Sequence, residues 1–372
     1  WMVLLNNFVV ERASFSGKEI GILQSIREIP GFLAFTTIFI LLLIREQKFA
    51  YVSLVMLGIG VLITGFFPSA LGLYLTTFVM SAGFHYFETV KQSLSLQWLS
   101  TQEAPEILGK LIALASFTSL ITYFCIWVSQ HYFSFSFESI YFVSGFICLI
   151  LTLLMWIGAP QFKGVTEQKK NLVFKRSYWL YYALTFMSGA RRQIFVVFAA
   201  FLMVEKFNYS VSDIAILFII NHTFNWLFAS KIGQLVGKFG ERKALTFEYC
   251  GLFLVFYAYA YVENAMLAGA LYVVDHLFFS LAIAIKTYFQ KIAEPSDIAS
   301  TAGVAFTINH IAAVFIPFSF GLVWLISPKF VFLMGAFMSL ISLILARNIP
   351  NNPKFGNEVI WDFINRSNFK RL

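Results

Sequence analysis

Long apolar runs recur along almost the whole chain, and they constrain its fold more than any other feature. A helix rises about 1.5 Å per residue, so roughly 20 apolar residues cross a hydrocarbon core of about 30 Å. The predicted membrane spans are residues 18–44, 49–66, 70–99, 107–129, 138–158, 177–205, 211–231, 244–262, 265–291, 297–326 and 329–347. Residues 1–10 are apolar but too short to span, so they are expected to be half of one further helix.

The composition supports the same fold class. Hydrophobic residues make up 59% of the chain and charged residues 12%, whereas a soluble domain has about a quarter charged residues. The net charge of +8 comes from short loops between apolar runs, which indicates membrane orientation and no nucleic-acid partner. We find no catalytic triad, phosphate-binding loop, nucleotide fingerprint or CxxC pair, so neither an enzyme nor a cofactor is predicted.

Lysine and arginine are concentrated in alternate loops, and this bias predicts the orientation of the chain. The basic-rich side includes the hydrophilic stretch 159–176 and the C-terminal tail, so both are expected to be cytoplasmic. The predicted organisation is an N-terminal half (1–158), a cytoplasmic central loop (159–176), a C-terminal half (177–347) and a cytoplasmic tail (348–372). We expect a multi-pass protein of the cell inner (plasma) membrane.

The two halves repeat each other, which is a sign of internal duplication. Residues 8–23 resemble residues 202–217 at a shift of 194. At a shift of about 191, His85 and residues 97–107 match His276 and residues 288–298. Six helices are an even number, so the two copies have the same orientation. A pseudo-two-fold axis along the membrane normal is therefore expected to relate two six-helix halves, the first helix being truncated in this sequence.

The segment 233–243 reads GQLVGKFGERK, which resembles the G-x-L-a-D-r-x-G-r-[kr] signature of major facilitator superfamily (MFS) transporters. The matching positions that the resemblance implicates in conformational change are Gly233, Lys238, Gly240, Arg242 and Lys243. Gly237 replaces the usual aspartate of the signature. Together with the duplicated halves, the resemblance implies an all-α MFS fold of twelve helices over the whole chain.

Two adjacent arginines, Arg191 and Arg192, lie in the middle of the span 177–205. A cation at that depth costs about 2.5 to 3.5 kcal/mol on insertion scales, and it usually faces a polar pathway or a counter-charge. We therefore expect at least one of them to line a transport cavity. The full set of predicted substrate-binding residues is Arg191, Arg192, Gln24, Arg27, Gln92, Asn221, Asn225 and Asn309.

Ionisable groups inside the other spans are candidates for proton coupling, since nearby charges and burial both change their affinity for protons. These candidates are Glu28, Glu88, Asp275, His85 and His276; two further histidines, His222 and His310, also fall inside predicted spans. An architectural alternative stays open, in which the charges only neutralise one another. Its pairs would be Glu28 with Arg27, Glu88 with Lys91, and Asp275 with Lys286.

The function predicted from these features is secondary active transport of a small, anionic organic solute by alternating access, with protons as a coupling ion. Its partners would be that solute and the lipid bilayer, and we expect a monomer. Efflux of hydrophobic or cationic compounds is one alternative, and a non-transporting receptor or assembly factor with the same fold is another. Transition-metal transport is a third, although no HxxxH spacing is present and no metal site is predicted.

The duplication also leads to an expectation about the first helix. The counterparts of Arg191 and Arg192 fall just before Trp1. We therefore expect roughly 15 to 25 further residues upstream, enough to complete a span, with a polar or basic residue near their midpoint.

A first testable prediction concerns coupling. If protons drive transport, Glu88→Gln or Asp275→Asn should stop or uncouple it, because each change removes an ionisable group from the membrane. The pH dependence of uptake between about pH 5 and 8, where histidines and perturbed carboxylates titrate, should then flatten. A wild-type pH profile in both variants would instead support structural pairs.

Overall fold

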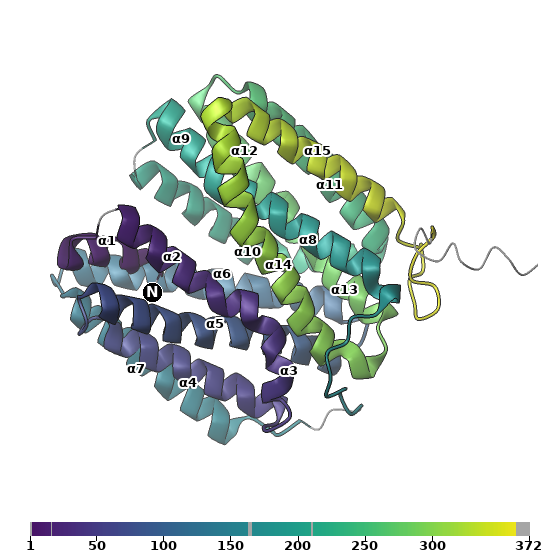
Figure 1. Ribbon diagram of the computed structural model, residues 1–372, viewed down its shortest axis with the longest axis horizontal. Helices are drawn as coiled ribbons and strands as arrows, with labels where there is room; N and C mark the ends of the chain where they lie inside the picture. The colour runs from purple at the N-terminus through teal and green to yellow at the C-terminus, as the bar shows by residue number, and fades with distance from the viewer. Residues whose placement is uncertain (1, 16, 163–165, 210, 362–372) are drawn as a thin grey trace, which may run out of the picture. The chain divides into compact units, whose positions relative to one another are not determined.

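The computed structural model of the chain describes residues 2–15, 17–162, 166–209 and 211–361 (Figure 1). Within these residues the regular structure is helical, apart from an isolated bridge between Lys354 and Asn357. Helices are expected here, because in hydrocarbon the backbone polar groups must find partners within their own segment. The α-helices are α1 (Met2–Ala13), α2 (Gly17–Phe32), α3 (Thr37–Ile40), α4 (Glu46–Thr64), α5 (Ala70–Trp98), α6 (Ala104–His131), α7 (Phe137–Gly158), α8 (Trp179–Gln193), α9 (Ala200–Phe207), α10 (Val211–Phe239), α11 (Glu241–Tyr261), α12 (Ala265–Phe279), α13 (Ile283–Ile292), α14 (Ile298–Ile326) and α15 (Pro328–Arg347).

Several spans contain short segments that depart from α geometry. A 3₁₀ turn, Leu33–Thr36, separates α2 from α3, and another, Ser280–Ala282, separates α12 from α13. Between α8 and α9 the helix is of the π type over Ile194–Ala199. Such segments often mark functional or strained positions in helices.

Eight helices in the described part of the chain are long and apolar enough to cross a membrane. They correspond to α4, α6, α7, α8–α9, α11, α12–α13, α14 and α15. Of the remaining predicted spans, 70–99 and 211–231 are helical as expected and 18–44 is helical only as far as Ile40, but none is among these eight. The predicted tail 348–372 is described only as far as Trp361, and Trp1 lies outside the described residues.

The chain divides into two compact units. Unit 1 consists of residues 1–98, 122–173 and 296–310, and unit 2 of residues 99–121, 174–295 and 311–372. The helices α6 and α14 therefore each contribute residues to both units. The halves predicted from the sequence, 1–158 and 177–347, stay a prediction.

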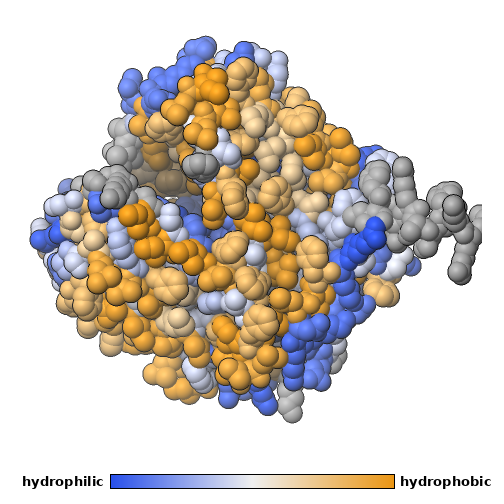
Figure 2. All heavy atoms as spheres, in the orientation of Figure 1, coloured by the Kyte–Doolittle hydropathy of each residue, from blue (hydrophilic) through white to orange (hydrophobic). Residues whose placement is uncertain are grey.

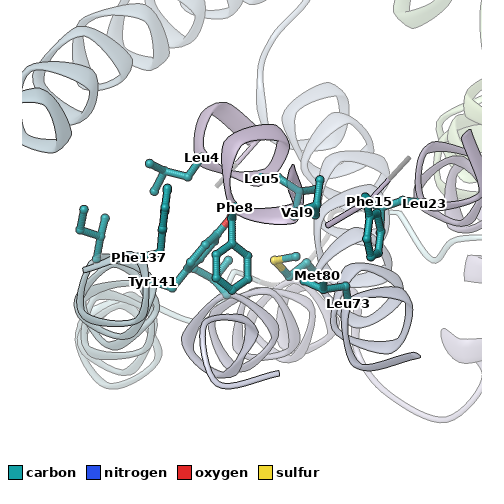
Figure 3. Packing of buried hydrophobic residues seen from close by; sticks show 12 residues of the cluster. Leu4, Leu5, Phe8, Val9, Phe15, Leu23, Leu73, Met80, Phe137 and Tyr141 are labelled. Atoms are coloured by element: carbon teal, nitrogen blue, oxygen red, sulfur yellow. The ribbon is translucent and has the colours of Figure 1, made fainter. Parts of the chain in front are cut away.

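A cluster of buried apolar side chains forms part of the core of unit 1 (Figure 3). Phe8 of α1 is fully buried, and its ring centroid lies 5.5 Å from that of Phe137 and 5.4 Å from that of Tyr141, both on α7. Met80 and Leu73 of α5 belong to the same cluster. The short helix α1 is thus held in unit 1 by aromatic packing against α7.

Glycines allow the helices of unit 1 to pack with their backbones close together. A Cβ atom at Gly83 of α5 would lie 2.4 Å from the Leu57 nitrogen and 2.6 Å from the Ser53 oxygen, both in the α4 backbone. At Gly145 of α7 it would lie 2.4 Å from the Leu62 nitrogen. The helix α4 is therefore packed on two sides against positions that have no side chain.

In unit 2, aromatic stacking joins the helices that follow the central loop. The ring of Tyr259 on α11 stacks on Phe332 of α15 at 5.0 Å between centroids, and Phe198 stacks on Trp324 of α14 at 5.5 Å. The residues of α6 in unit 2 approach α10 at Gly109, where a Cβ atom would lie 2.3 Å from the Ala229 oxygen. Small residues of this kind are common where membrane helices meet.

Large apolar side chains on several helices are exposed, and much of the face shown in Figure 2 is hydrophobic. The most apolar stretch of α6 has only 6% of its residues buried, and that of α7 has 22%. Large exposed apolar surfaces are rare on soluble proteins but are expected where side chains meet lipid. The exposed surface therefore agrees with a protein that lies in a bilayer.

The close packing of α4 and α5 leads to a prediction about stability. Gly83→Ala should lower the free energy of unfolding by about 1 to 3 kcal/mol, because the new methyl group would meet backbone atoms that cannot move aside. The melting temperature of the purified protein in detergent measures this effect. Gly158→Ala at the end of α7, where nothing lies within 4 Å of a Cβ atom, is the matched control and should melt like the wild type. Equal melting of both variants would contradict the packing.

Candidate functional site

A cluster of buried charged groups lies in unit 2, and we call Arg191, Glu248, Tyr249 and Asp275 the charge cluster. Arg191 comes from α8, Glu248 and Tyr249 from α11, and Asp275 from α12. The three charged residues have no more than 1% of their surface exposed. Groups from three helices are thus brought together away from solvent.

Helical periodicity explains why these side chains face inward. On α11 the buried residues Leu245, Glu248 and Leu252 repeat at three and four positions, which places them on one face of the helix. Arg191 continues the row of Leu184 and Met187 on α8 in the same way. The position of each charged residue is therefore set by the apolar residues one turn before or after it.

The geometry of the charge cluster centres on the Arg191 guanidinium. Its Nη2 atom lies 3.9 Å from Oε1 of Glu248, and its central carbon lies 4.3 Å from the centroid of the Tyr249 ring. Its Nε donates a hydrogen bond to the Met187 carbonyl at 3.2 Å. Asp275 interacts electrostatically with both Arg191 and Glu248. One cation is thus shared by two carboxylates.

Such an arrangement is costly when every group is charged. Removing an ion from water costs several kcal/mol even after relaxation, and its partners must compensate for that loss. Both terminal guanidinium nitrogens of Arg191, both carboxylate oxygens of Glu248 and Oδ1 of Asp275 are buried without a hydrogen-bond partner among the described residues. With one positive and two negative charges, the cluster becomes neutral when it binds one proton.

The backbone next to the charge cluster is irregular on two spans. The π-helical segment begins at Ile194, directly after Gln193, and the 3₁₀ turn that follows α12 begins at Ser280, shortly after Asp275. A π-helical segment holds an extra residue relative to an α-helix, so a return to α geometry would rotate one part of the span against the other. The irregular segments are therefore suited to a change in the surroundings of Arg191.

Asn225, a predicted substrate-binding residue, lies beside His276, a predicted proton-coupling residue. The Asn225 side-chain amide donates to Nε2 of His276 at 3.0 Å, and the Ser280 hydroxyl donates to Oδ1 of Asn225 at 3.0 Å. Since Nε2 accepts this hydrogen bond, the imidazole is neutral. Asn221, one turn earlier on α10, is also buried.

A second polar group lies in unit 1, and we call Arg27, Glu28, His85 and His310 the histidine cluster. Arg27 donates to Oε1 of Glu28 at 2.8 Å, and Nε2 of His310 lies 3.8 Å from Oε2 of Glu28. The rings of His85 and His310 are 4.9 Å apart between centroids. Three predicted residues, Arg27, Glu28 and His85, are thus brought together with a histidine that was not among the predicted site residues.

The other predicted residues lie in different surroundings. Glu88 forms an ion pair with Lys91 on its own helix, so the architectural pairings of Glu88 with Lys91 and of Glu28 with Arg27 are confirmed. The suggested pairing of Asp275 with Lys286 is wrong, because eleven residues of helix separate them by about 16 Å, and Asp275 is buried with Arg191 while Lys286 is exposed. Of the remaining predicted binding residues, Arg192 is exposed, whereas the side chains of Gln24, Gln92 and Asn309 are half-buried.

Glu248, Tyr249 and His310 belong to these clusters but are not among the site residues predicted from the sequence. Glu248 lies inside the predicted span 244–262, so a carboxylate within an apolar run is a signal that the sequence offers. Tyr249 gives no such signal, because aromatic residues are frequent throughout this chain. His310 was placed inside a span, but the sequence could not show which helices would surround it.

The signature segment 233–243 lies where α10 meets α11. A Cβ atom at Gly233 would lie 2.1 Å from the Pro105 oxygen of α6, and Gly240 has a φ of 83°, which favours glycine. Arg242 donates to the Asn351 side chain at 3.2 Å, whereas Lys238 and Lys243 are exposed. Two of the three glycines of the segment thus have a structural reason, a close helix approach at Gly233 and a turn at Gly240.

Comparisons with known proteins agree with this fold. The family profile of the Major Facilitator Superfamily matches residues 1–317. No curated protein matches the sequence at a significant level. Among solved structures, FucP in the outward conformation, a transporter whose Escherichia coli form is described as a fucose:proton symporter, has a TM-score of 0.72 and 13% sequence identity, with 92% of this chain and 94% of that chain covered.

Two further structures have similar folds. The human organic anion transporter MFSD10 (TETRAN) has a TM-score of 0.70 and 11% identity, with 92% of this chain and 88% of that chain covered. A bacterial homologue of the iron transporter ferroportin, in its outward-facing state, has a TM-score of 0.69 and 13% identity, with 93% and 94% covered. At these identities the likeness concerns the fold alone.

The charge cluster predicts a difference between two adjacent arginines. Arg191→Gln should lower the free energy of unfolding by about 3 to 5 kcal/mol, because it leaves two buried carboxylates without a counter-charge. Arg192→Gln changes an exposed residue of the same type on the same helix and should have a small effect. Melting temperatures of both variants in detergent give the comparison. Similar melting of the two would show that Arg191 does not balance buried charge.

Proposed function

The chain belongs to the major facilitator superfamily, and from this premise we propose that it is a proton-coupled secondary transporter of a small organic solute. The observation that carries the proposal is the charge cluster, in which one buried arginine faces two buried carboxylates. A carrier that is driven by protons needs a group that gains and loses a proton during its cycle. Glu248 and Asp275 together supply that group.

A proton that binds to the charge cluster removes the unfavourable energy of an uncompensated buried charge. With Arg191 positive and both carboxylates ionised, the charge cluster holds one uncompensated negative charge in surroundings of low dielectric constant. One proton, shared by Glu248 and Asp275, neutralises it, and the pair titrates as a unit. Uptake of the proton thus favours the arrangement in which all three side chains stay buried together.

Loss of the proton favours a different arrangement. Two ionised carboxylates repel each other, and contact with water or with a second cation stabilises them. A shift of the π-helical segment Ile194–Ala199 by one residue would turn Arg191 by about 100° relative to the residues that follow it. The proton would then be coupled to the conformation of the helix that carries the arginines.

The prediction of an anionic solute depends on Arg192. Arg191 is buried with its carboxylate partners, so recognition of an anion would fall to Arg192, whose side chain is exposed on the same helix. Structures with this fold are described as a fucose:proton symporter and as an organic anion transporter, and both kinds of solute are compatible with the fold. We keep the anionic solute as a prediction, with efflux of hydrophobic or cationic compounds as its alternative.

Infrared spectroscopy tests the proton site without a known solute. The wild-type protein should show the carbonyl stretch of a protonated carboxylic acid, which disappears as the pH is raised. Glu248→Gln and Asp275→Asn should each remove or shift this band, because each change breaks the shared site. In proteoliposomes with a solute found by thermal-shift screening, both variants should abolish solute-driven proton entry, which a trapped pH-sensitive dye reports.

Glu88→Gln is the matched control for these variants. Glu88 is also a carboxylate inside a predicted span, but it pairs with Lys91 at a partly exposed position on its own helix. This pairing replaces the expectation from the sequence that Glu88 takes part in coupling, so Glu88→Gln should leave both the infrared band and proton entry as in the wild type. Proton entry that stops in Glu88→Gln and persists in Glu248→Gln and Asp275→Asn would assign coupling to α5 and refute the charge cluster as the proton site.

A further inference from the structure

Three polar side chains converge in unit 1 from helices that are distant in the sequence. Glu28 lies on α2, His85 on α5, and His310 on the part of α14 that belongs to unit 1. One ligand atom from each lies within 4.8 Å of the other two. We propose that these residues bind a divalent first-row transition-metal ion, because two imidazoles and one carboxylate form a ligand set that suits Zn²⁺, Fe²⁺ and Mn²⁺.

Both imidazoles are oriented in the way that metal-binding histidines usually are. Nδ1 of His85 lies 2.9 Å from the Ser81 carbonyl oxygen, and Nδ1 of His310 lies 2.9 Å from the Phe306 carbonyl oxygen. A carbonyl oxygen only accepts, so Nδ1 carries the proton and donates in both rings. The lone pair of each neutral ring is therefore on Nε2. Metal ligands commonly donate their other ring N–H to a carbonyl group, which fixes the tautomer.

The carboxylate is oriented by a partner of its own. Arg27 donates to Oε1 of Glu28 through Nη2 at 2.8 Å and through Nε at 3.1 Å. The other oxygen, Oε2, faces Nε2 of His310 at 3.8 Å, which is too long for a hydrogen bond. In a tetrahedral site, two atoms that bind one ion at about 2.1 Å lie about 3.4 Å apart. Binding would therefore draw this pair together by about 0.4 Å, and the widest spacing in the cluster, at most 4.8 Å, by up to about 1.4 Å.

Hydroxyl groups fix the helices that carry the two histidines to α2. The Ser81 hydroxyl, one turn before the histidine of α5, donates to the Arg27 carbonyl. The Thr307 hydroxyl, one turn before the histidine of α14, donates to the Phe32 carbonyl at 3.0 Å and accepts from the Phe35 nitrogen at 3.0 Å. These bonds use backbone groups around the break between α2 and the 3₁₀ turn. Both histidines are thus held at fixed positions relative to Glu28.

The sequence at the break leaves space for the ring of His310. Gly31 follows Pro30 near the end of α2, and a Cβ atom at this glycine would lie 2.3 Å from Cδ2 of His310. Any side chain at position 31 would therefore push the imidazole away from α2. The missing side chain lets His310 lie directly against the helix that carries the carboxylate.

The ligand set also indicates how such an ion would behave. Three protein ligands leave at least one coordination position for water or another exchangeable ligand, as in open zinc sites. Calcium and magnesium prefer oxygen ligands, so two nitrogen ligands select against them. Arg27 offsets the charge of Glu28, which weakens binding and favours exchange over permanent retention. The site belongs to unit 1 and shares no residue with the charge cluster of unit 2, so it does not depend on the proton proposal.

Cobalt(II) is the probe for a test, because its visible absorption reports nitrogen and oxygen ligation. The full chain is purified in detergent without a histidine tag, stripped with a chelator and titrated with Co²⁺. One ion per chain should bind, and Zn²⁺ should displace it. His85→Gln, His310→Gln and Glu28→Gln should each weaken binding about tenfold or more, since each removes one ligand.

His222→Gln is the matched control, since it changes another histidine inside a predicted span and should bind Co²⁺ like the wild type. Electron paramagnetic resonance of the wild type with Cu²⁺ gives a second measurement that needs no variant, and it should show hyperfine coupling to two imidazole nitrogens. Absence of saturable binding to the folded wild type would overturn the proposal. So would affinity that is unchanged in both His85→Gln and His310→Gln, which would leave Glu28 and His310 as a plain ion pair.

Discussion

The structure depends on one constraint, which is that a polar group inside hydrocarbon must find its partner within the protein. For the backbone the solution is the helix, and the described part of the chain is accordingly built from helices. For charged side chains the solution is other side chains, and these have to come from neighbouring helices. Arg191 finds Glu248 and the face of Tyr249 on α11 in this way.

The same constraint explains where the helices are irregular. The π-helical segment follows the arginines, a 3₁₀ turn follows Asp275 and His276, and the break after α2 follows Arg27 and Glu28. In a soluble protein an irregular segment can exchange its backbone hydrogen bonds with water. Within a bilayer it persists only where nearby protein groups satisfy the backbone, as Thr307 does at the break in α2. Polar clusters and irregular helices thus support each other.

Small residues provide the other condition for bringing polar groups together. Gly83 lets α5 approach α4, Gly233 lets α10 approach α6, and Gly31 lets an imidazole lie against α2. Each removes a side chain at a point where two backbones, or a backbone and a ring, come closer than a Cβ atom allows. The polar clusters can be compact because the helices that carry them are packed closely.

The sequence by itself determined the fold class and most of the spans. Long apolar runs, basic loops and the duplicated halves are features of local composition and of repetition, and the linear sequence shows both without any knowledge of packing. The signature of residues 233–243 then indicated the superfamily, which the family comparison confirms. The sequence also placed the ionisable residues inside the membrane, since a charge in an apolar run is visible without any knowledge of packing.

Only the tertiary structure decided which of these residues are partners. Arg191 and Arg192 are the same residue type in adjacent positions, yet the first is buried beside Glu248 and the second is exposed. Asp275 interacts with Arg191, which lies three spans earlier in the chain, and Glu28 lies beside His310, near the other end of the chain. Adjacent residues on a helix point about 100° apart, and partners on different helices have no fixed spacing in sequence. The pairing of charges is therefore a property of helix packing, which no motif along the chain records.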